Sequence, residues 1–262
     1  MIHLVHLETD ITTACQLSCV GCNHEVPLYR AAGPPRSAEP AQVESDLAHL
    51  GRVAHADTWG ALGGEPTLSS KLVDILHVVR ASGVADRIEV WTNGLTARKL
   101  KPEFWRALDV LVLSIYPGKL TDNDVAWIRA KCVDEGVQLD EKDERYHPNF
   151  KTLLEPTPTN AEATRAKFAG CFFRHFSRVV NFGYFFTCCC APHMPMLIQG
   201  RPFGSDGVPV ADITEAQLKA YLERVEPLGA CTICAGRDTA VDIVWSEERN
   251  PLMWVEKSGQ RL

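Results

Sequence analysis

Strand-like and helix-like segments alternate along about the first 140 residues of this 262-residue chain. Strands are expected at 2–9, 56–62, 88–92, 110–115 and 137–139. Helices are expected over about 43–50, 72–79, 102–108 and 122–135. This alternation predicts an α/β fold with a parallel sheet and right-handed crossovers, either open or curled into a partial barrel. Active residues are then expected on loops that follow the carboxyl ends of the strands.

The ten cysteines are grouped, which favours metal binding over disulfide bonds. The N-terminus lacks the basic start and apolar stretch of a signal peptide, so we expect a cytoplasmic protein with reduced thiols. Three cysteines fall at 15–22, four at 171–190 and two at 231–234. The remaining one, Cys132, shares a predicted helix face with Val125 and Ile128, and we expect it to pack in the core.

Cys15, Cys19 and Cys22 form a C-x3-C-x2-C motif directly after the first expected strand. Three thiolates can hold three irons of a [4Fe-4S] cluster and leave the fourth iron open to a small molecule. A structural cluster or zinc site would normally have four protein ligands. The spacing therefore indicates a reactive centre.

The net charge of −6 is dispersed, and no Lys/Arg cluster with interleaved aromatic residues is present. This argues against a nucleic-acid partner. No apolar run approaches the length needed to cross a membrane. A small molecule or a peptide is the expected substrate.

The run Thr13-x-Cys15-Gln-Leu-x-Cys19-x-x-Cys22, followed by Gly63-Gly64-Glu65-Pro66 after a later strand, resembles the radical S-adenosylmethionine (SAM) superfamily. The resemblance implies a partial (β/α)6 TIM-like barrel as the core, over 1–145 or to about 165. It also implies that SAM chelates the open iron and that its reductive cleavage gives a 5'-deoxyadenosyl radical. The electron would come from a flavodoxin- or ferredoxin-type donor. The implied SAM contacts are Gly63, Gly64, Glu65, Thr92, Asn93 and Ser114.

Cys171, Gly183 and Cys188 have the spacing of the hairpin found in the SPASM and twitch subfamilies, and Cys231-x2-Cys234 follows. The resemblance implies a small C-terminal twitch subdomain over 166–262, with a β-hairpin at 178–187 and a helix at about 213–226. It also implies a second, auxiliary [4Fe-4S] cluster on Cys171, Cys188, Cys231 and Cys234. Enzymes of this type modify carbohydrates or aminocyclitols in aminoglycoside biosynthesis.

Cys189 and Cys190 are not needed by either cluster. One hypothesis is that one of these thiols returns a hydrogen atom to the opposite face of a substrate carbon, which would make the enzyme an epimerase. The alternative is a dehydrogenase, in which the auxiliary cluster accepts an electron and the alcohol becomes a ketone. We narrowly favour the epimerase here because a dehydrogenase has no evident need for extra thiols. Radical modification of a ribosomal peptide is a third hypothesis.

Other polar residues remain open at this stage. His24 follows the cysteine loop and is a candidate contact to SAM or substrate, whereas His147 and His193 are expected on the surface or in loops. The charged, Pro-rich stretch 140–160 is interpreted as a linker. It offers several candidates for a catalytic base, namely Glu141, Arg145 and Tyr146.

Overall fold

One curved, open sheet organises this computed structural model, which describes residues 1–145, 151–154, 160–236 and 240–257. Its strand order is β5-β4-β3-β2-β1-β7-β8-β9. The strands from β5 to β7 in this order pair in parallel, and β8 and β9 complete the sheet in antiparallel fashion. The strands are β1 (Ile2–Thr12), β2 (Ala54–Gly63), β3 (Ala85–Thr92), β4 (Val110–Ile115), β5 (Gln138–Asp143), β7 (Ser177–Asn181), β8 (Tyr184–Phe186) and β9 (Val208–Pro209).

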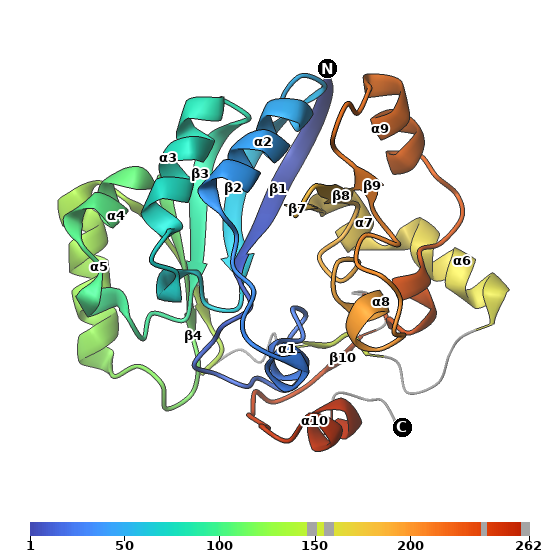
Figure 1. The fold of residues 1–262 in the computed structure, drawn as a ribbon. Coiled ribbons are helices and arrows are strands. Elements are labelled where there is room, and N and C mark those ends of the chain that lie inside the picture. Colours follow the sequence, from blue (N-terminus) through green and yellow to red (C-terminus); the bar gives the residue numbers. More distant parts are fainter. Residues whose placement is uncertain (146–150, 155–159, 237–239, 258–262) are drawn as a thin grey trace.

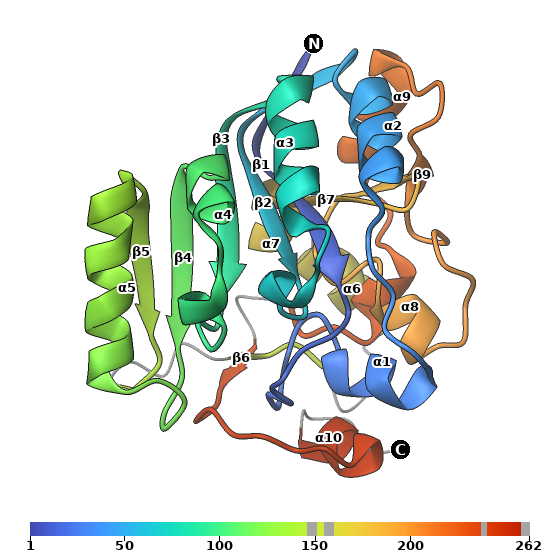
Figure 2. The same cartoon turned by 60° about the vertical axis from the view of Figure 1, so that its left-hand side comes forward.

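Helices cover the convex side of this sheet, as expected for right-handed β–α–β units (Figures 1 and 2). They are α2 (Pro40–Leu50), α3 (Leu72–Ser82), α4 (Pro102–Ala107) and α5 (Asp122–Glu135), and shorter turns η1 (Pro66–Leu68) and η2 (Ala97–Lys99) lie between them. The predicted alternation of strands and helices is confirmed. α3 and α5 end at Gly83 and Gly136, which adopt left-handed φ values of 60° and 70°.

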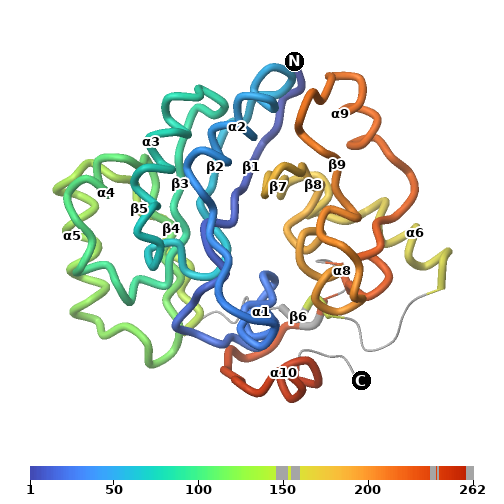
Figure 3. Tube along the Cα trace, viewed as in Figure 1, coloured from blue at the N-terminus to red at the C-terminus, as the bar shows by residue number. Residues whose placement is uncertain are grey.

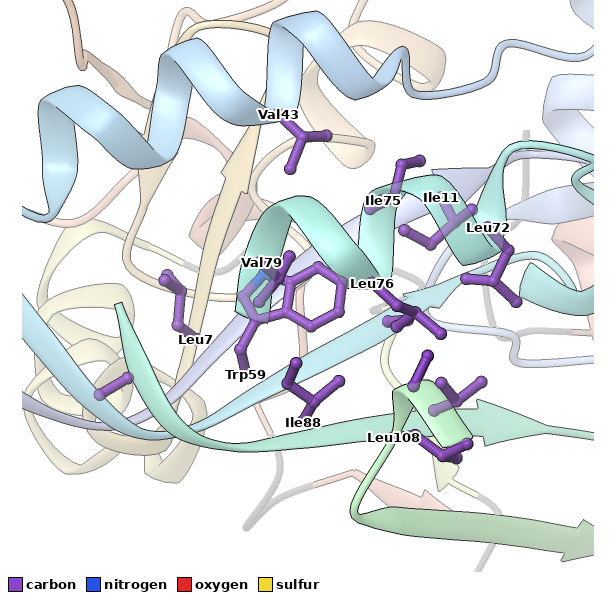
Figure 4. Packing of buried hydrophobic residues seen from close by; sticks show 14 of the residues in the cluster. Leu7, Ile11, Val43, Trp59, Leu72, Ile75, Leu76, Val79, Ile88 and Leu108 are labelled. Carbon is purple, nitrogen blue, oxygen red and sulfur yellow. The ribbon is translucent and has the colours of Figure 1, made fainter. Parts of the chain in front are cut away.

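The main apolar core lies between the sheet and these helices (Figure 4). Trp59 of β2 is fully buried there, and its indole nitrogen donates to Thr9 Oγ1 at 3.1 Å. Leu7 and Ile11 of β1 face the same core. Because strand residues alternate between faces, His6, Glu8 and Asp10 point to the concave side instead. Cys132 is 1% exposed and belongs to this core, as predicted.

The predicted hairpin is present as β7 and β8. Phe182 and Gly183 form its two-residue turn with φ values of 46° and 84°, the left-handed pair typical of a type I′ turn. The sequence did not indicate where the hairpin attaches. β7 lies parallel to β1, with Leu7 opposite Arg178, so the C-terminal half of the chain continues the N-terminal sheet (Figure 3).

Most of the remaining elements pack around a second apolar core that includes Phe168, Phe186, Met194 and Trp254, whereas Leu218 of the helix at Glu215–Leu222 packs in the main core. Val20, from the cysteine loop, also belongs to it. The elements are α1 (Val26–Ala32), β6 (Lys151–Thr152), α6 (Ala161–Gly170), α7 (Phe172–Phe176), α8 (Met194–Leu197), α9 (Glu215–Leu222), η3 (Gly229–Thr232), β10 (Val241–Asp242) and α10 (Pro251–Lys257). The helix expected at 213–226 is thus shorter than predicted.

The linker prediction for 140–160 is partly wrong. Its first residues belong to β5, and Lys151–Thr152 form β6, which pairs with β10. β5 is charged because it is the edge strand of the sheet, where charged side chains reach solvent. Residues 146–150 and 155–159 lie outside the described part of the chain. None of the described helices has both the length and the apolar character needed to span a membrane.

Replacing Trp59 by Ala should destabilise the fold strongly, because it leaves a cavity in a fully buried site. The expected loss is about 3–5 kcal/mol of unfolding free energy. Denaturant-induced unfolding measures it, with Val133→Ala as a control at a side chain that is 80% exposed. A Trp59→Ala loss as small as that of the control would contradict this packing.

Candidate active site

The cysteine loop leaves the carboxyl end of β1 and is held by Arg30 of α1. The Arg30 guanidinium donates to Cys15 O at 2.9 Å, to Leu17 O at 3.2 Å and to Ser18 Oγ at 2.6 Å. These bonds satisfy carbonyl groups that no strand or helix would pair. The loop is therefore fixed before any ligand binds.

The three thiols of this loop line one cavity. Burial raises the pKa of Cys15 to about 11 and that of Cys22 to about 12, and it raises the pKa of Cys19 further. Buried thiols of this kind become thiolates only when a cation compensates their charge. N–H donors already point at the sulfurs, with Leu17 N at 3.4 Å from Cys15 Sγ. The donor set therefore fits a bound iron–sulfur cluster.

The Gly63-Gly64 turn packs directly against the cysteine loop. Gly64 N donates to Thr12 O at 2.6 Å, and Glu65 N donates to Ala14 O at 2.7 Å. A Cβ atom on Gly64 would lie 2.2 Å from Ala14 O, which leaves no room for any side chain. Only glycine permits this close approach of two backbones.

Glu65 joins the ends of β2 and β3. It is 1% exposed, and its carboxylate accepts from Thr92 Oγ1 at 2.7 Å and from Asn93 N at 2.8 Å. Burial raises its pKa, whereas these hydrogen bonds act in the opposite direction. The Asn93 side chain in turn donates to Gln16 Oε1 at 3.2 Å, so this network reaches the cysteine loop.

The cavity at this edge of the sheet has a volume of about 800 Å³. It brings the three loop cysteines together with every residue expected to contact SAM: Gly63, Gly64, Glu65, Thr92, Asn93 and Ser114. Their roles stay predictions, but their convergence is a property of the fold. The lining also includes Glu141, Asp143 and Glu144 at and just after the end of β5, and its basic residues in the described part of the chain are Lys142 and His24.

A second, smaller pocket lies beyond this cavity. It is lined by Cys171, Cys188, Cys190, Cys231 and Cys234, together with apolar side chains. Burial raises the pKa of Cys188 well above its usual value, and it raises the pKa of Cys231 to about 12. Four of these thiols are the ones expected to hold an auxiliary cluster, and the donor set fits one. Phe173 of α7 lines both this pocket and the large cavity.

The two spare cysteines differ in position. Cys190 faces the small pocket, whereas Cys189 is not among its lining residues. Cys189 is 2% exposed, and its sulfur lies 3.9 Å from Cys190 Sγ and 3.5 Å from Asn23 Nδ2. Neither thiol is among the described residues that line the large cavity, although Asn23 is.

Asp10, at the end of β1, forms a buried charged group with two histidines. His24 Nδ1 lies 2.9 Å from Asp10 Oδ1, and His193 Nε2 lies 3.1 Å from Asp10 Oδ2. Burial alone would raise the pKa of Asp10, but the nearby His193 and His24 hold it well below its usual range. Tyr29 OH pairs with His193 Nδ1 at 2.9 Å, and the Asn181 side chain donates to Asp10.

This group corrects one prediction. His193 lies in a loop, which the prediction allowed, but it is 3% exposed and not on the surface, because its ring packs between Asp10 at Nε2 and Tyr29 at Nδ1. His24 lines the large cavity, as a contact to SAM or substrate would require, and His147 lies outside the described residues. The two imidazoles and the carboxylate offer ligand atoms within 4.8 Å of one another, so they could also hold one metal ion.

Sequence reasoning missed Glu25 altogether. It is 1% exposed with a left-handed φ of 46°, and burial beside Cys189 and Cys234 raises its pKa well above the usual value. No periodic or spacing signal marks such a residue.

Two of the candidate bases, Glu141 and Arg145, are already in ion pairs. Glu141 pairs with Arg129 at 2.6 Å, and Arg145 pairs with Asp143 at 2.8 Å.

A polar network also crosses the concave side of the sheet. His6 lies 3.1 Å from Glu8 Oε1 and 3.4 Å from Glu89 Oε2. Glu89 Oε2 also accepts from the indole of Trp91, which lines the large cavity, at 3.2 Å. Burial alone would lower the pKa of His6, but Glu8 and Glu89 raise it to about 9.

Comparison with solved structures relates this geometry to known proteins. anSMEcpe with bound AdoMet matches with a TM-score of 0.53 and 12% identity, over 97% of this chain and 95% of that one. BtrN in complex with AdoMet and 2-DOIA matches with a TM-score of 0.50 and 13% identity, over 88% of this chain and 86% of that one. Both are radical SAM enzymes. This chain has the radical SAM fold.

The predicted radical SAM core is therefore confirmed at the level of the fold. No protein-family model matches the chain, and no curated protein sequence matches it. The chemistry of the site must accordingly be argued from its own residues.

Replacing Gly64 by Ala should disturb the cysteine loop, because the new methyl group would collide with Ala14 O. We expect a cost of about 1–3 kcal/mol and less iron and sulfide bound after anaerobic reconstitution. Gly170→Ala is the matched control, since its Cβ would meet nothing within 4 Å. Equal iron content in the two variants would argue against the close approach at Gly64.

The His6 network predicts a specific pH dependence of stability. Because the folded state raises the pKa of His6 from 6.5 to about 9, its contribution is complete below pH 6.5 and is lost as the pH rises to about 9. His6→Gln should flatten the fall in unfolding free energy over this interval. His77→Gln, at an exposed position of α3, should leave the fall unchanged. Parallel curves for wild type and His6→Gln would refute the assignment.

Proposed function

We propose that the protein is a radical SAM enzyme that oxidises a secondary alcohol of a sugar or aminocyclitol to a ketone. The observation that carries this proposal is the arrangement of the two cysteine sites. Three cysteines line the large cavity, the remaining expected ligands line the smaller pocket, and Phe173 lines both. An alcohol bound in the cavity would thus lie between a site where a radical starts and a site that takes up an electron.

Different residues of the large cavity would bind the cluster and SAM. Cys15, Cys19 and Cys22 would hold a [4Fe-4S] cluster, and Gly63 and Gly64 line the part of the cavity where the methionine part of SAM would bind. When bound, these groups supply a 5'-deoxyadenosyl radical that removes the carbinol hydrogen atom, and an auxiliary cluster supplies an electron acceptor. Glu65 keeps the Thr92–Asn93 turn in place beside them.

Oxidation of the alcohol requires three losses from the substrate: a hydrogen atom from carbon, a proton from the hydroxyl group and one electron. Cys171, Cys188, Cys231 and Cys234 would hold the acceptor of that electron, directly behind Phe173. Because the two pockets share Phe173, the acceptor would lie near the substrate, which favours electron loss over other fates of the substrate radical. The neighbour BtrN is a dehydrogenase, which agrees with this reading.

The charge of the cavity lining favours a substrate that carries amino groups. The carboxylates of Glu65, Glu141, Asp143 and Glu144 line the cavity, against two basic residues, Lys142 and His24, in the described part of the chain. Arg129 and Arg145 pair with Glu141 and Asp143 and offset part of this negative charge. A phosphorylated sugar would be repelled there, whereas an ammonium group would be attracted. An aminocyclitol therefore fits better than a sugar phosphate.

Epimerisation is the second candidate, because Cys189 lies one side chain behind the cavity wall. Its sulfur contacts Asn23, and Asn23 lines the cavity. A movement of Asn23 would open a path from this thiol to a substrate carbon. Cys189 and Cys190 are nevertheless buried, and neither is among the described residues that line the large cavity. Oxidation is therefore the better supported of the two reactions.

Anaerobic assays with SAM and dithionite, or with a flavodoxin- or ferredoxin-type donor, test the proposal. Aminocyclitols, neutral sugars and peptides are compared by 5'-deoxyadenosine release and product mass. We expect a ketone two mass units lighter than an aminocyclitol substrate, with turnover retained in Cys189→Ala. An alcohol product of inverted configuration that carries deuterium at carbon when the reaction is run in D2O would instead establish an epimerase, provided that Cys189→Ala no longer forms it. Turnover of peptides alone would reject both.

A further inference from the structure

A strap formed by residues 245–254 lies over the cysteine loop, although more than 200 residues separate the two in sequence. Val20 N donates to Ser246 O at 2.9 Å, and Glu248 N donates to Ser18 O at 2.9 Å. Cys19 and Glu247 form an isolated antiparallel bridge between these bonds. In Figures 1 and 2, α10 at the end of this strap lies beside α1, which follows the cysteine loop.

Side chains anchor the strap at both ends. Glu247 accepts from Ser18 N at 3.0 Å and pairs with Lys119. Trp254, 1% exposed, donates its indole N–H to Cys19 O at 2.7 Å. These contacts fix the strap on Ser18 and Cys19 of the cysteine loop.

Trp245 makes the decisive contact. Its indole nitrogen lies 3.1 Å from Cys19 Sγ. The indole ring stacks on Tyr116, with centroids 5.2 Å apart and planes inclined by 18°, and Lys119 Nζ lies 5.4 Å from the ring centroid. The ring is therefore held on both sides with its N–H directed at the sulfur.

Cys19 differs from the other two cysteines because its donor is an indole N–H of a distant segment. Backbone N–H groups donate to Cys15 and Cys22, from Leu17 and from His24 and Val26 respectively, and Asn93 Nδ2 makes a longer contact of 3.9 Å with Cys15 Sγ. The donor to Cys19 in the described chain is a side chain 226 positions away. It can therefore be removed without altering the backbone of the loop.

We propose that Trp245 is a positioning residue that raises the reduction potential of the cluster held by Cys15, Cys19 and Cys22. A hydrogen bond to a cysteine sulfur withdraws negative charge, so it stabilises the reduced cluster, which carries one more electron, over the oxidised one. This inference rests on the proposed function, because it requires that cluster. It implies that the strap adjusts how readily the first electron enters the site.

Trp245→Phe tests the inference, since phenylalanine keeps an aromatic ring against Tyr116 but has no N–H. The reduction potential is measured by redox titration of the reconstituted protein, followed by electron paramagnetic resonance (EPR). The spectral change on adding SAM identifies the cluster at Cys15, Cys19 and Cys22. We expect a more negative potential than in wild type. Trp127→Phe on α5 is the matched control and should leave the potential unchanged.

Equal potentials in wild type and Trp245→Phe, or an equal shift in Trp127→Phe, would overturn the inference. Unmodified protein with ¹⁵N-indole tryptophan gives an independent readout that does not depend on the variant's folding. Its reduced cluster should show magnetic coupling to an indole nitrogen, and absence of that coupling would also overturn it. A wild-type protein that binds no SAM-responsive cluster would instead refute the proposed function, so the two failures are distinguishable.

Discussion

The parallel pairing of β1 with β2 on one side and with β7 on the other is the contact on which the rest of the structure depends. β1 contributes to three environments at once. Its apolar residues, such as Leu7 and Ile11, face the main core, and its polar residues face the concave side. Its carboxyl end continues into the cysteine loop. Any shift in register along β1 would therefore exchange core and site residues together.

Buried charges on the concave face of β1 are costly unless each has a partner. Here every one is paired: His6 with Glu8 and Glu89, and Asp10 with His24 and His193. The partners come from β3, from the segment after the cysteine loop and from the segment before α8. The polar side of the sheet thus ties together the same parts of the chain that supply the two cysteine sites.

Much of this architecture could be predicted from local sequence patterns. Apolar periodicity indicated the strands and helices of the first half, and the left-handed turn at Phe182–Gly183 is a local signal of the hairpin. The cysteine spacing and the two glycines at 63 and 64 indicated the loops that meet at one edge of the sheet. These features depend on neighbours in sequence, which is why they could be recognised.

The features that could not be predicted depend on contacts between distant segments. The attachment of β7 to β1, the burial of His193 against Asp10 and the strap over Cys19 each join residues more than 160 positions apart. Single residues such as Glu25 and Trp245 carry no spacing pattern. Their surroundings are set by packing, and packing is not visible in composition or periodicity.

The position of the strap has a consequence for how the protein matures in the cell. During synthesis the cysteine loop leaves the ribosome long before Trp245 and Trp254, since N-terminal segments are made first. The loop is therefore open to iron and sulfide donors while the rest of the chain is being translated. Once the strap forms its bonds to Ser18, Cys19 and Val20, that side of the loop is closed. This side of the loop therefore gives access to the thiols only until residues 245–254 have been made and have folded onto it.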